Sequence, residues 1–248
     1  MALTHSPSVA VVLPGTGSDA HFVDHAFRGP LSARSVRTVA IEPDPRRVVG
    51  SYLDAMDAAA TECGKILVGG VSIGAAVALQ WAALNPDKTS GVLAALPPWT
   101  GAPDHAPAAA SARFTSSQLR SEGLESVIAA MLASSPAWLG HELERSWRSQ
   151  WPDLPAALDE AATYYSLTEA ALAEIDVPVG IAIALDDPVH PATVGYEWAA
   201  ALPRAEVGTL ELDQIGHDAA ILGATCLEAL TAAGFSQPPR APEVNVSY

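Results

Sequence analysis

The sequence is poor in basic residues, in cysteine and in long apolar runs. Its 248 residues include 13 Lys and Arg against 28 Asp and Glu, which gives a formal net charge of −15. Nucleic acids and anionic membrane surfaces would repel such a chain, so we expect neither as a partner. No apolar run approaches the length of a membrane span, and the first ten residues lack the basic and then apolar order of a secretory signal. These absences predict a soluble cytoplasmic protein.

Cysteine is nearly absent. Cys63 and Cys226 are the only two thiols, and no CxxC spacing connects them to a redox or zinc motif. We expect both to be reduced and buried.

Six short apolar runs alternate with segments of helical periodicity, and continuous apolar runs are typical of strands buried on both faces. One helix is expected over 19–33 and another after Asp44 and Pro45, which would be its N-cap and first residue. The alternation predicts an α/β fold, with a mostly or wholly parallel six-stranded sheet flanked by helices. The expected strands are 8–15, 35–44, 65–70, 90–96, 177–185 and 205–212.

Residues 97–176 interrupt this alternation. The segment opens with a Pro- and Ala-rich stretch, 97–112, which is typical of a loop, and continues with helical patches. We expect a helical cap inserted after the fourth strand, across one end of a core formed by 1–96 and 177–236. Residues 237–248 are expected to be a flexible tail. Four of the six tryptophans lie in the insertion, where they would form either the core of the cap or an apolar substrate pocket: Trp99, Trp138, Trp147 and Trp151.

Ser72 lies in the sequence Gly-Val-Ser-Ile-Gly, between an expected strand and an expected helix. The pattern G-x-S-x-G could be a chance match in a chain rich in small residues. It could also be a tight turn that exposes a nucleophilic serine at the carboxyl edge of the sheet, and the strand–turn–helix context favours this interpretation.

A serine nucleophile needs a base, and the base needs a group that orients it. His217 follows the last expected strand, and Asp186 and Asp187 follow the strand before it. The carboxyl ends of parallel strands meet at one edge of a sheet, so we predict a triad of Ser72, His217 and one of the two aspartates.

These residues, in the order Ser, Asp, His, resemble the α/β-hydrolases of the capped esterase type over nearly the whole chain. The resemblance implies a serine hydrolase fold trimmed to six strands, because the chain has no room for the family's usual N-terminal hairpin. It implies oxyanion donors at the backbone N–H groups of Thr16 and Ile73. The loop Pro14–Asp19 lacks the histidine that commonly braces it in the family.

The same resemblance favours Asp187 as the acid, because similar enzymes often place it three residues after a small residue and four before a proline. Ala184 and Pro191 meet both conditions. Asp187 also precedes Pro188, which begins the turn from which the carboxylate must reach the histidine. Asp186 remains the alternative.

Other motifs are weaker. His21 and His25 have the i,i+4 spacing of a metal pair, but neither an adjacent glutamate nor a third ligand is apparent, so we expect no metal. The stretch PGTGSD matches neither the phosphate-binding loop nor the dinucleotide fingerprint, and no cofactor is expected.

The sequence thus predicts a serine hydrolase that cleaves an ester or thioester of a small apolar substrate through an acyl-enzyme. A carbon–carbon bond hydrolase using the same triad is the related alternative. The alternative from another class is a small-molecule receptor or carrier on the same fold, since a fold does not determine a function.

Overall fold

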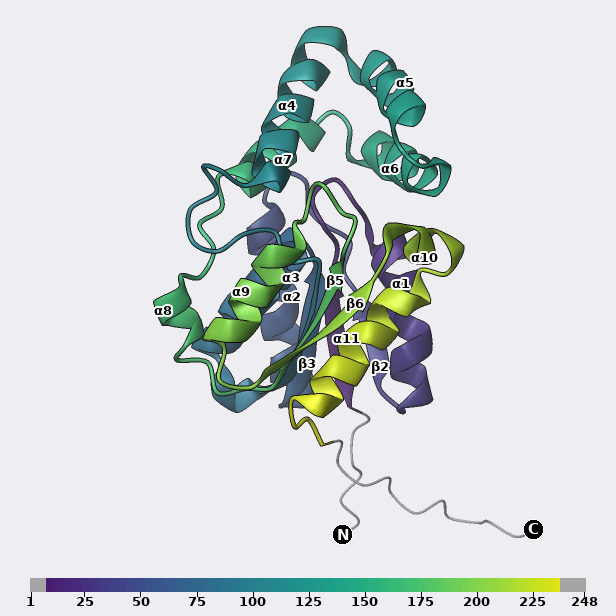
Figure 1. Ribbon diagram of the computed structural model, residues 1–248. Coiled ribbons are helices and arrows are strands. Elements are labelled where there is room, and N and C mark those ends of the chain that lie inside the picture. The colour runs from purple at the N-terminus through teal and green to yellow at the C-terminus, as the bar shows by residue number, and fades with distance from the viewer. Residues whose placement is uncertain (1–7, 237–248) are drawn as a thin grey trace, which may run out of the picture.

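Six strands form one sheet in the order β2-β1-β3-β4-β5-β6, and every neighbouring pair is parallel. The computed structural model describes residues 8–236 (Figure 1), so the predicted tail at 237–248 lies outside the described residues. The prediction of a parallel six-stranded sheet is confirmed. The strands are β1 (Val9–Leu13), β2 (Arg37–Ala40), β3 (Ile66–Val71), β4 (Thr89–Ala95), β5 (Val179–Ala184) and β6 (Ala205–Leu210).

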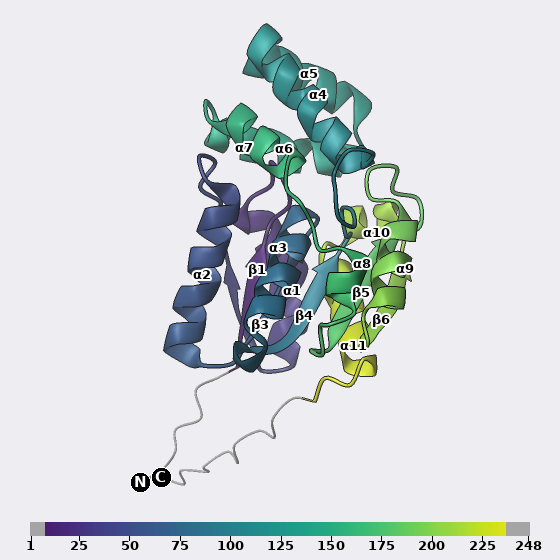
Figure 2. The ribbon, with the colours of Figure 1, turned by 90° about the vertical axis from the view of Figure 1, so that its left-hand side faces the viewer.

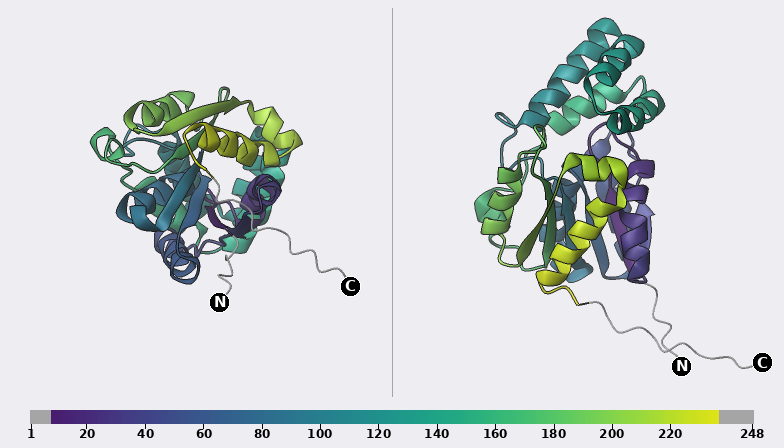
Figure 3. Two further views of the ribbon diagram at one scale, coloured as in Figure 1. Left: turned by 90° about the horizontal axis from the view of Figure 1, so that it is seen from below. Right: turned by 45° about the vertical axis from the view of Figure 1, so that its right-hand side comes forward.

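Helices cover both faces of this sheet (Figures 2 and 3). One face carries α1 (Ala20–Ala33) and α11 (Ala220–Ala232). The other carries α2 (Val48–Cys63), α3 (Ile73–Leu84) and α9 (Ala192–Ala201), while the short α10 (Leu212–His217) follows β6. None of the helices within residues 8–236 combines the length and apolar character that crossing a membrane requires.

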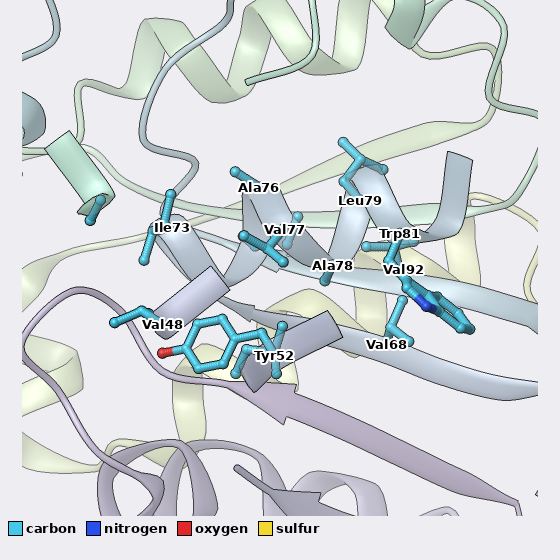
Figure 4. Close-up of a cluster of buried hydrophobic side chains, with 14 of the residues drawn as sticks. Val48, Tyr52, Val68, Ile73, Ala76, Val77, Ala78, Leu79, Trp81 and Val92 are labelled. Carbon is cyan, nitrogen blue, oxygen red and sulfur yellow. The ribbon is translucent and has the colours of Figure 1, made fainter. Parts of the chain in front are cut away.

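The two helical layers explain why β1, β3 and β5 are apolar at every position. Val9 and Val11 of β1 join the core beneath α2 and α3, whereas Ala10 and Val12 join the core beneath α1 and α11. The edge strands β2 and β6 are only partly buried. Figure 4 shows side chains of α2 and α3 that meet in the first of these cores: Val48, Tyr52, Ile73, Ala76 and Val77.

The start of α2 differs from the prediction. The helix begins at Val48, and Asp44 instead accepts hydrogen bonds from the backbone and side chain of Arg46. The N–H groups of Val48 and Val49, which have no partner within the helix, donate to the Glu160 carboxylate at 2.7 and 3.0 Å. A carboxylate at a helix N-terminus accepts hydrogen bonds from N–H groups that have no partner within the helix, and its negative charge interacts favourably with the helix dipole. The capping residue therefore comes from a segment more than 100 residues away, where no local pattern could reveal it.

Five helices lie between β4 and β5. They are α4 (Pro107–Glu122), α5 (Leu124–Ser134), α6 (Ala137–Gln150), α7 (Leu154–Ala162) and α8 (Glu169–Leu172). Figure 1 shows α4 to α7 above the edge at which the strands end, and α8 beside α9. The loop predicted over 97–112 is wrong from Pro107 onward, because proline is well suited to the first position of a helix.

The contact between α1 and α11 depends on Gly223. A Cβ at this position would lie 2.2 Å from the carbonyl oxygen of Ala26 and 3.0 Å from the Cα of Phe27, so the two helices could not keep their present separation.

We therefore expect Gly223→Ala to lower the free energy of unfolding by about 1–3 kcal/mol, the usual cost of overpacking a core. Equilibrium unfolding in urea, followed by circular dichroism, measures the change. Gly29→Ala in α1 is the matched control. Apart from its chain neighbours and the backbone of its own helix, no atom lies within 4 Å of the added methyl group, and its effect should stay within about 1 kcal/mol. Equal stabilities of the two variants would contradict the close contact.

Candidate functional site

Ser72 occupies a strained turn between β3 and α3. Its φ of 54° and ψ of −120° lie in a region that residues other than glycine rarely adopt. A Cβ at Gly70 or at Gly74 would lie 2.4 Å from the carbonyl oxygen of Leu13. The two glycines thus allow β1 to pass close beside the turn, and the serine is set between them at the carboxyl end of β3.

The Ser72 hydroxyl ends a chain of two hydrogen bonds. Its Oγ lies 2.9 Å from Nε2 of His190, and Nδ1 of the same ring lies 2.8 Å from Oδ2 of Asp187. With its proton on Nδ1, the imidazole donates to Asp187 and can accept the hydroxyl proton at Nε2. Both partners are largely buried, with 16% of the His190 side chain and 6% of the Asp187 side chain exposed, so little water competes for these bonds.

Asp187 is held by its own turn. Its Oδ1 accepts from the backbone N–H groups of Val189 and His190 at 2.7 and 3.1 Å, while Oδ2 faces the imidazole. Burial alone would raise the pKa of this carboxyl, but the hydrogen bonds and charge of His190 and the two backbone donors outweigh it and lower the pKa. The group is therefore a carboxylate at neutral pH.

Asp186 points elsewhere. Its Oδ1 accepts from the backbone N–H of Leu212 at 2.8 Å and so connects the end of β5 to the start of α10. Of the two adjacent aspartates, Asp187 is the one that contacts the histidine beside Ser72.

The geometry corrects the prediction that His217 pairs with Ser72. His217 is the last residue of α10, its side chain is exposed, and its Nδ1 lies 2.6 Å from the carbonyl oxygen of Asp213. Glu211 and Gln214 form a capping box that starts this helix directly after β6. The ring of His217 thus contacts the backbone of its own helix, and His190 holds the position beside Ser72 that was predicted for it.

The spacing between Asp187 and His190 is a sequence signal that could have identified His190. This histidine lies three residues after Asp187 in Asp-Asp-Pro-Val-His-Pro. At that spacing a turn can bring an aspartate carboxylate onto both the backbone and the ring of the later residue. Residue order instead favours the histidine after the last strand.

The loop Pro14–Asp19 passes beside Ser72. A Cβ at Gly15 would lie 3.4 Å from the Cβ of Ser72, and Ser18 closes a turn by donating to the Gly15 carbonyl. Within residues 8–236, neither the backbone N–H of Thr16 nor that of Ile73, the first residue of α3, donates to another protein group. The two predicted oxyanion donors thus have no partner among the described residues.

The predicted pocket tryptophans occupy different places. Trp99 lines a cavity of about 540 Å³ beside the His190 loop, together with His105, Pro191 and Glu197. Trp138 and Trp147 project from α6 and do not line this cavity. Their indole nitrogens are buried and have no hydrogen-bond partner among the described residues. A larger hollow of about 750 Å³ lies at the opposite edge of the sheet, away from Ser72.

The rings of His21 and His25 lie side by side, with their centroids 4.1 Å apart. The ring nitrogen Nδ1 of His25 lies 2.8 Å from the His21 carbonyl oxygen. His21 also lies near the carboxylates of Asp19 and Glu142, with ligand atoms within 4.8 Å of one another. The Arg145 guanidinium contacts both carboxylates and so offsets part of their charge.

Comparisons with known proteins agree with this fold. MenH from S. aureus superposes with a TM-score of 0.68 at 16% identity, covering 94% of this chain and 96% of its own. The enol-lactonase from Burkholderia xenovorans LB400 gives 0.66 at 17%, covering 93% and 94%. A carboxylesterase structure from the thaumarchaeon Nitrososphaera gargenis gives 0.68 at 14%, covering 86% and 85%. At these identities the similarity shows the fold alone.

A search of curated proteins finds no match to the sequence. The sequence does match the alpha/beta hydrolase family over residues 2–225, a stretch that includes every strand of the sheet and all the residues around Ser72. The chain belongs to the alpha/beta hydrolase family.

Proposed function

We propose that the protein is a serine hydrolase that cleaves a carboxylic ester or thioester of a small apolar substrate. The observation that carries the proposal is the hydrogen-bonded chain from Ser72 through His190 to Asp187 at a strained strand–helix turn. A strained nucleophile with a base and an orienting carboxylate in line is the arrangement needed for acyl transfer.

In the first half of the proposed reaction, Ser72 Oγ attacks the substrate carbonyl carbon while His190 Nε2 takes the hydroxyl proton. The Oγ–carbon bond forms as the carbonyl becomes a tetrahedral oxyanion. The imidazolium then protonates the leaving alcohol or thiol as its bond to the acyl carbon breaks. In the second half, His190 Nε2 takes a proton from water as the water oxygen attacks the acyl carbon. The imidazolium then returns this proton to Ser72 Oγ as the acyl–Oγ bond breaks and the carboxylic acid leaves.

Asp187 would keep the imidazole in the tautomer that leaves Nε2 free, and would stabilise the positive charge that appears on the ring. Its lowered pKa supports this role, because a neutral acid could do neither. The backbone N–H groups of Thr16 and Ile73 would donate to the oxyanion and stabilise its charge.

The lining of the cavity beside the His190 loop is the evidence for an apolar substrate. Proline, alanine and tryptophan side chains form much of its wall, and Asp104 and Glu197 place carboxyl groups at it. An acyl or alcohol group without negative charge would suit this lining best. Of the three predicted pocket tryptophans, Trp99 is the one that lines this cavity, and all three remain predictions as substrate-pocket residues.

Ser72→Ala should abolish labelling by a fluorophosphonate and lower the turnover of p-nitrophenyl butyrate by about 10³-fold or more, as removal of a triad nucleophile does. Mass spectrometry of the labelled wild-type protein should place the adduct on Ser72. The variant should keep its circular dichroism spectrum, because alanine meets no more strain at this φ than serine does. Turnover within about tenfold of wild type would refute the serine mechanism.

The two histidines allow a matched test of the base. His190→Ala should lower kcat/KM by about 10³-fold or more, because Ser72 loses the acceptor of its proton. His217→Ala makes the same change at an exposed side chain near the same sheet edge, and its rate should stay within about tenfold of wild type. The reverse ranking would assign the base to His217, as the order of residues along the chain predicts.

The adjacent aspartates provide a similar pair. Asp187→Asn should depress kcat near neutral pH by about 10⁴-fold, since an asparagine amide would favour the wrong imidazole tautomer. Asp186→Asn should cost far less, because the amide oxygen of asparagine can still accept from the Leu212 N–H. Equal losses in the two variants, measured on folded protein, would be inconsistent with Asp187 as the orienting acid.

A further inference from the structure

The loop Pro14–Asp19 is held mainly through its carbonyl oxygens. The Tyr52 hydroxyl of α2 donates to the Pro14 carbonyl at 2.9 Å. Helix α6, in the cap formed by α4 to α7, supplies the next two donors. Ser146 Oγ donates to the Gly17 carbonyl at 2.7 Å, and the Gln150 amide donates to the Ser18 carbonyl at 2.9 Å. The cap thus holds the two residues that follow Thr16.

These two side chains of α6 are buried and connected to each other. Ser146 is 1% exposed and Gln150 is 4% exposed. The second N–H of the Gln150 amide donates to Ser146 Oγ at 2.8 Å, so the chain of bonds runs from Gln150 through Ser146 to Gly17. Because the Ser18 carbonyl can only accept, the amide nitrogen must face it. Polar groups this deeply buried are costly unless they are paired, and here both donors of the amide are used.

Two further contacts fix the same stretch. Gly17 has φ +70°, and a Cβ there would lie 2.9 Å from Nε1 of Trp147, so the α6 tryptophan packs directly on this residue. Arg145 donates to both carboxylate oxygens of Asp19 at 2.9 and 3.0 Å. Asp19 in turn accepts from the Phe22 N–H at the start of α1. Residues 17, 18 and 19 are therefore each held by α6.

We propose that Ser146 and Gln150 are positioning residues for the oxyanion donor at Thr16, in place of the brace that the loop itself lacks. The inference rests on the proposed serine hydrolase function. An oxyanion donor stabilises the transition state only when it is fixed at hydrogen-bond distance from the developing charge. The amide of Thr16 belongs to a short loop whose following residues are fixed from the cap, so loosening α6 moves the donor without touching the triad.

Ser146→Ala and Gln150→Met test this inference on the full chain, since both keep the volume nearly unchanged and remove the donors. Each should lower kcat for p-nitrophenyl butyrate by about tenfold to a hundredfold, the usual effect of slight misplacement of a catalytic group, and change KM by less than about threefold. Ser149→Ala is the matched control. Its hydroxyl donates to the Ser146 carbonyl within α6 and not to the loop, so kcat should not change.

A second readout separates positioning from general loosening of the structure. An alkyl trifluoromethyl ketone forms an anionic tetrahedral adduct with a serine nucleophile, so its affinity should fall in parallel with kcat/KM in the two variants. The affinity for the corresponding alkyl trifluoromethyl carbinol, which has no carbonyl group, carries no charge and forms no such adduct, should stay constant.

Wild-type kcat and ketone affinity in folded Ser146→Ala would overturn the inference, as would losses that Ser149→Ala shares. If Gln150→Met does not fold, Ser146→Ala decides alone, because it deletes one oxygen atom. Failure of the serine mechanism is distinguishable, because it would appear as retained turnover in Ser72→Ala, whatever the α6 variants do.

Discussion

The close passage of the β1 end beside the β3–α3 turn is the constraint on which the site depends. The Leu13 carbonyl oxygen occupies the space that a side chain at Gly70 or Gly74 would need. Because β1 comes so near, the loop that follows it is brought against Ser72, and the Thr16 and Ile73 amides belong to the two segments that meet there. Larger residues at 70 or 74 would push the strand and the turn apart. The close approach of β1 to the turn therefore places both the nucleophile and the candidate oxyanion donors.

Much of the fold could be predicted from the sequence because the pattern that carries it is local. A strand buried on both faces must be apolar at every position, and the run at Val9–Leu13 is visible without knowledge of its neighbours. The same holds for Ser72, since two glycines at fixed distances from a serine, between a strand and a helix, are typical of a nucleophile turn. These features depend on residues adjacent in the chain.

The histidine could not be predicted in the same way. His190 and His217 both follow strands that end at the same edge of the sheet, so strand order alone does not distinguish them. The two histidines differ in the hydrogen-bond partners of their rings. The Asp187 turn holds the ring of His190 toward Ser72, whereas the α10 capping box directs His217 to the Asp213 carbonyl. The cap that Glu160 of α7 forms at the start of α2 could not be predicted for a related reason, because Glu160 and its partners are distant in sequence.

Several polar contacts between the cap and the core use main-chain groups of the core. Ser146 and Gln150 bind carbonyl oxygens, and Glu160 binds two N–H groups of α2. Main-chain acceptors and donors are present whatever residue occupies a position, so these contacts place few demands on the side chains of the core. A different helical layer that offered a hydroxyl, an amide and a carboxylate at these three places would find the same partners. A layer that replaced this one would also have to supply a cation for Asp19 and apolar side chains for the shared core.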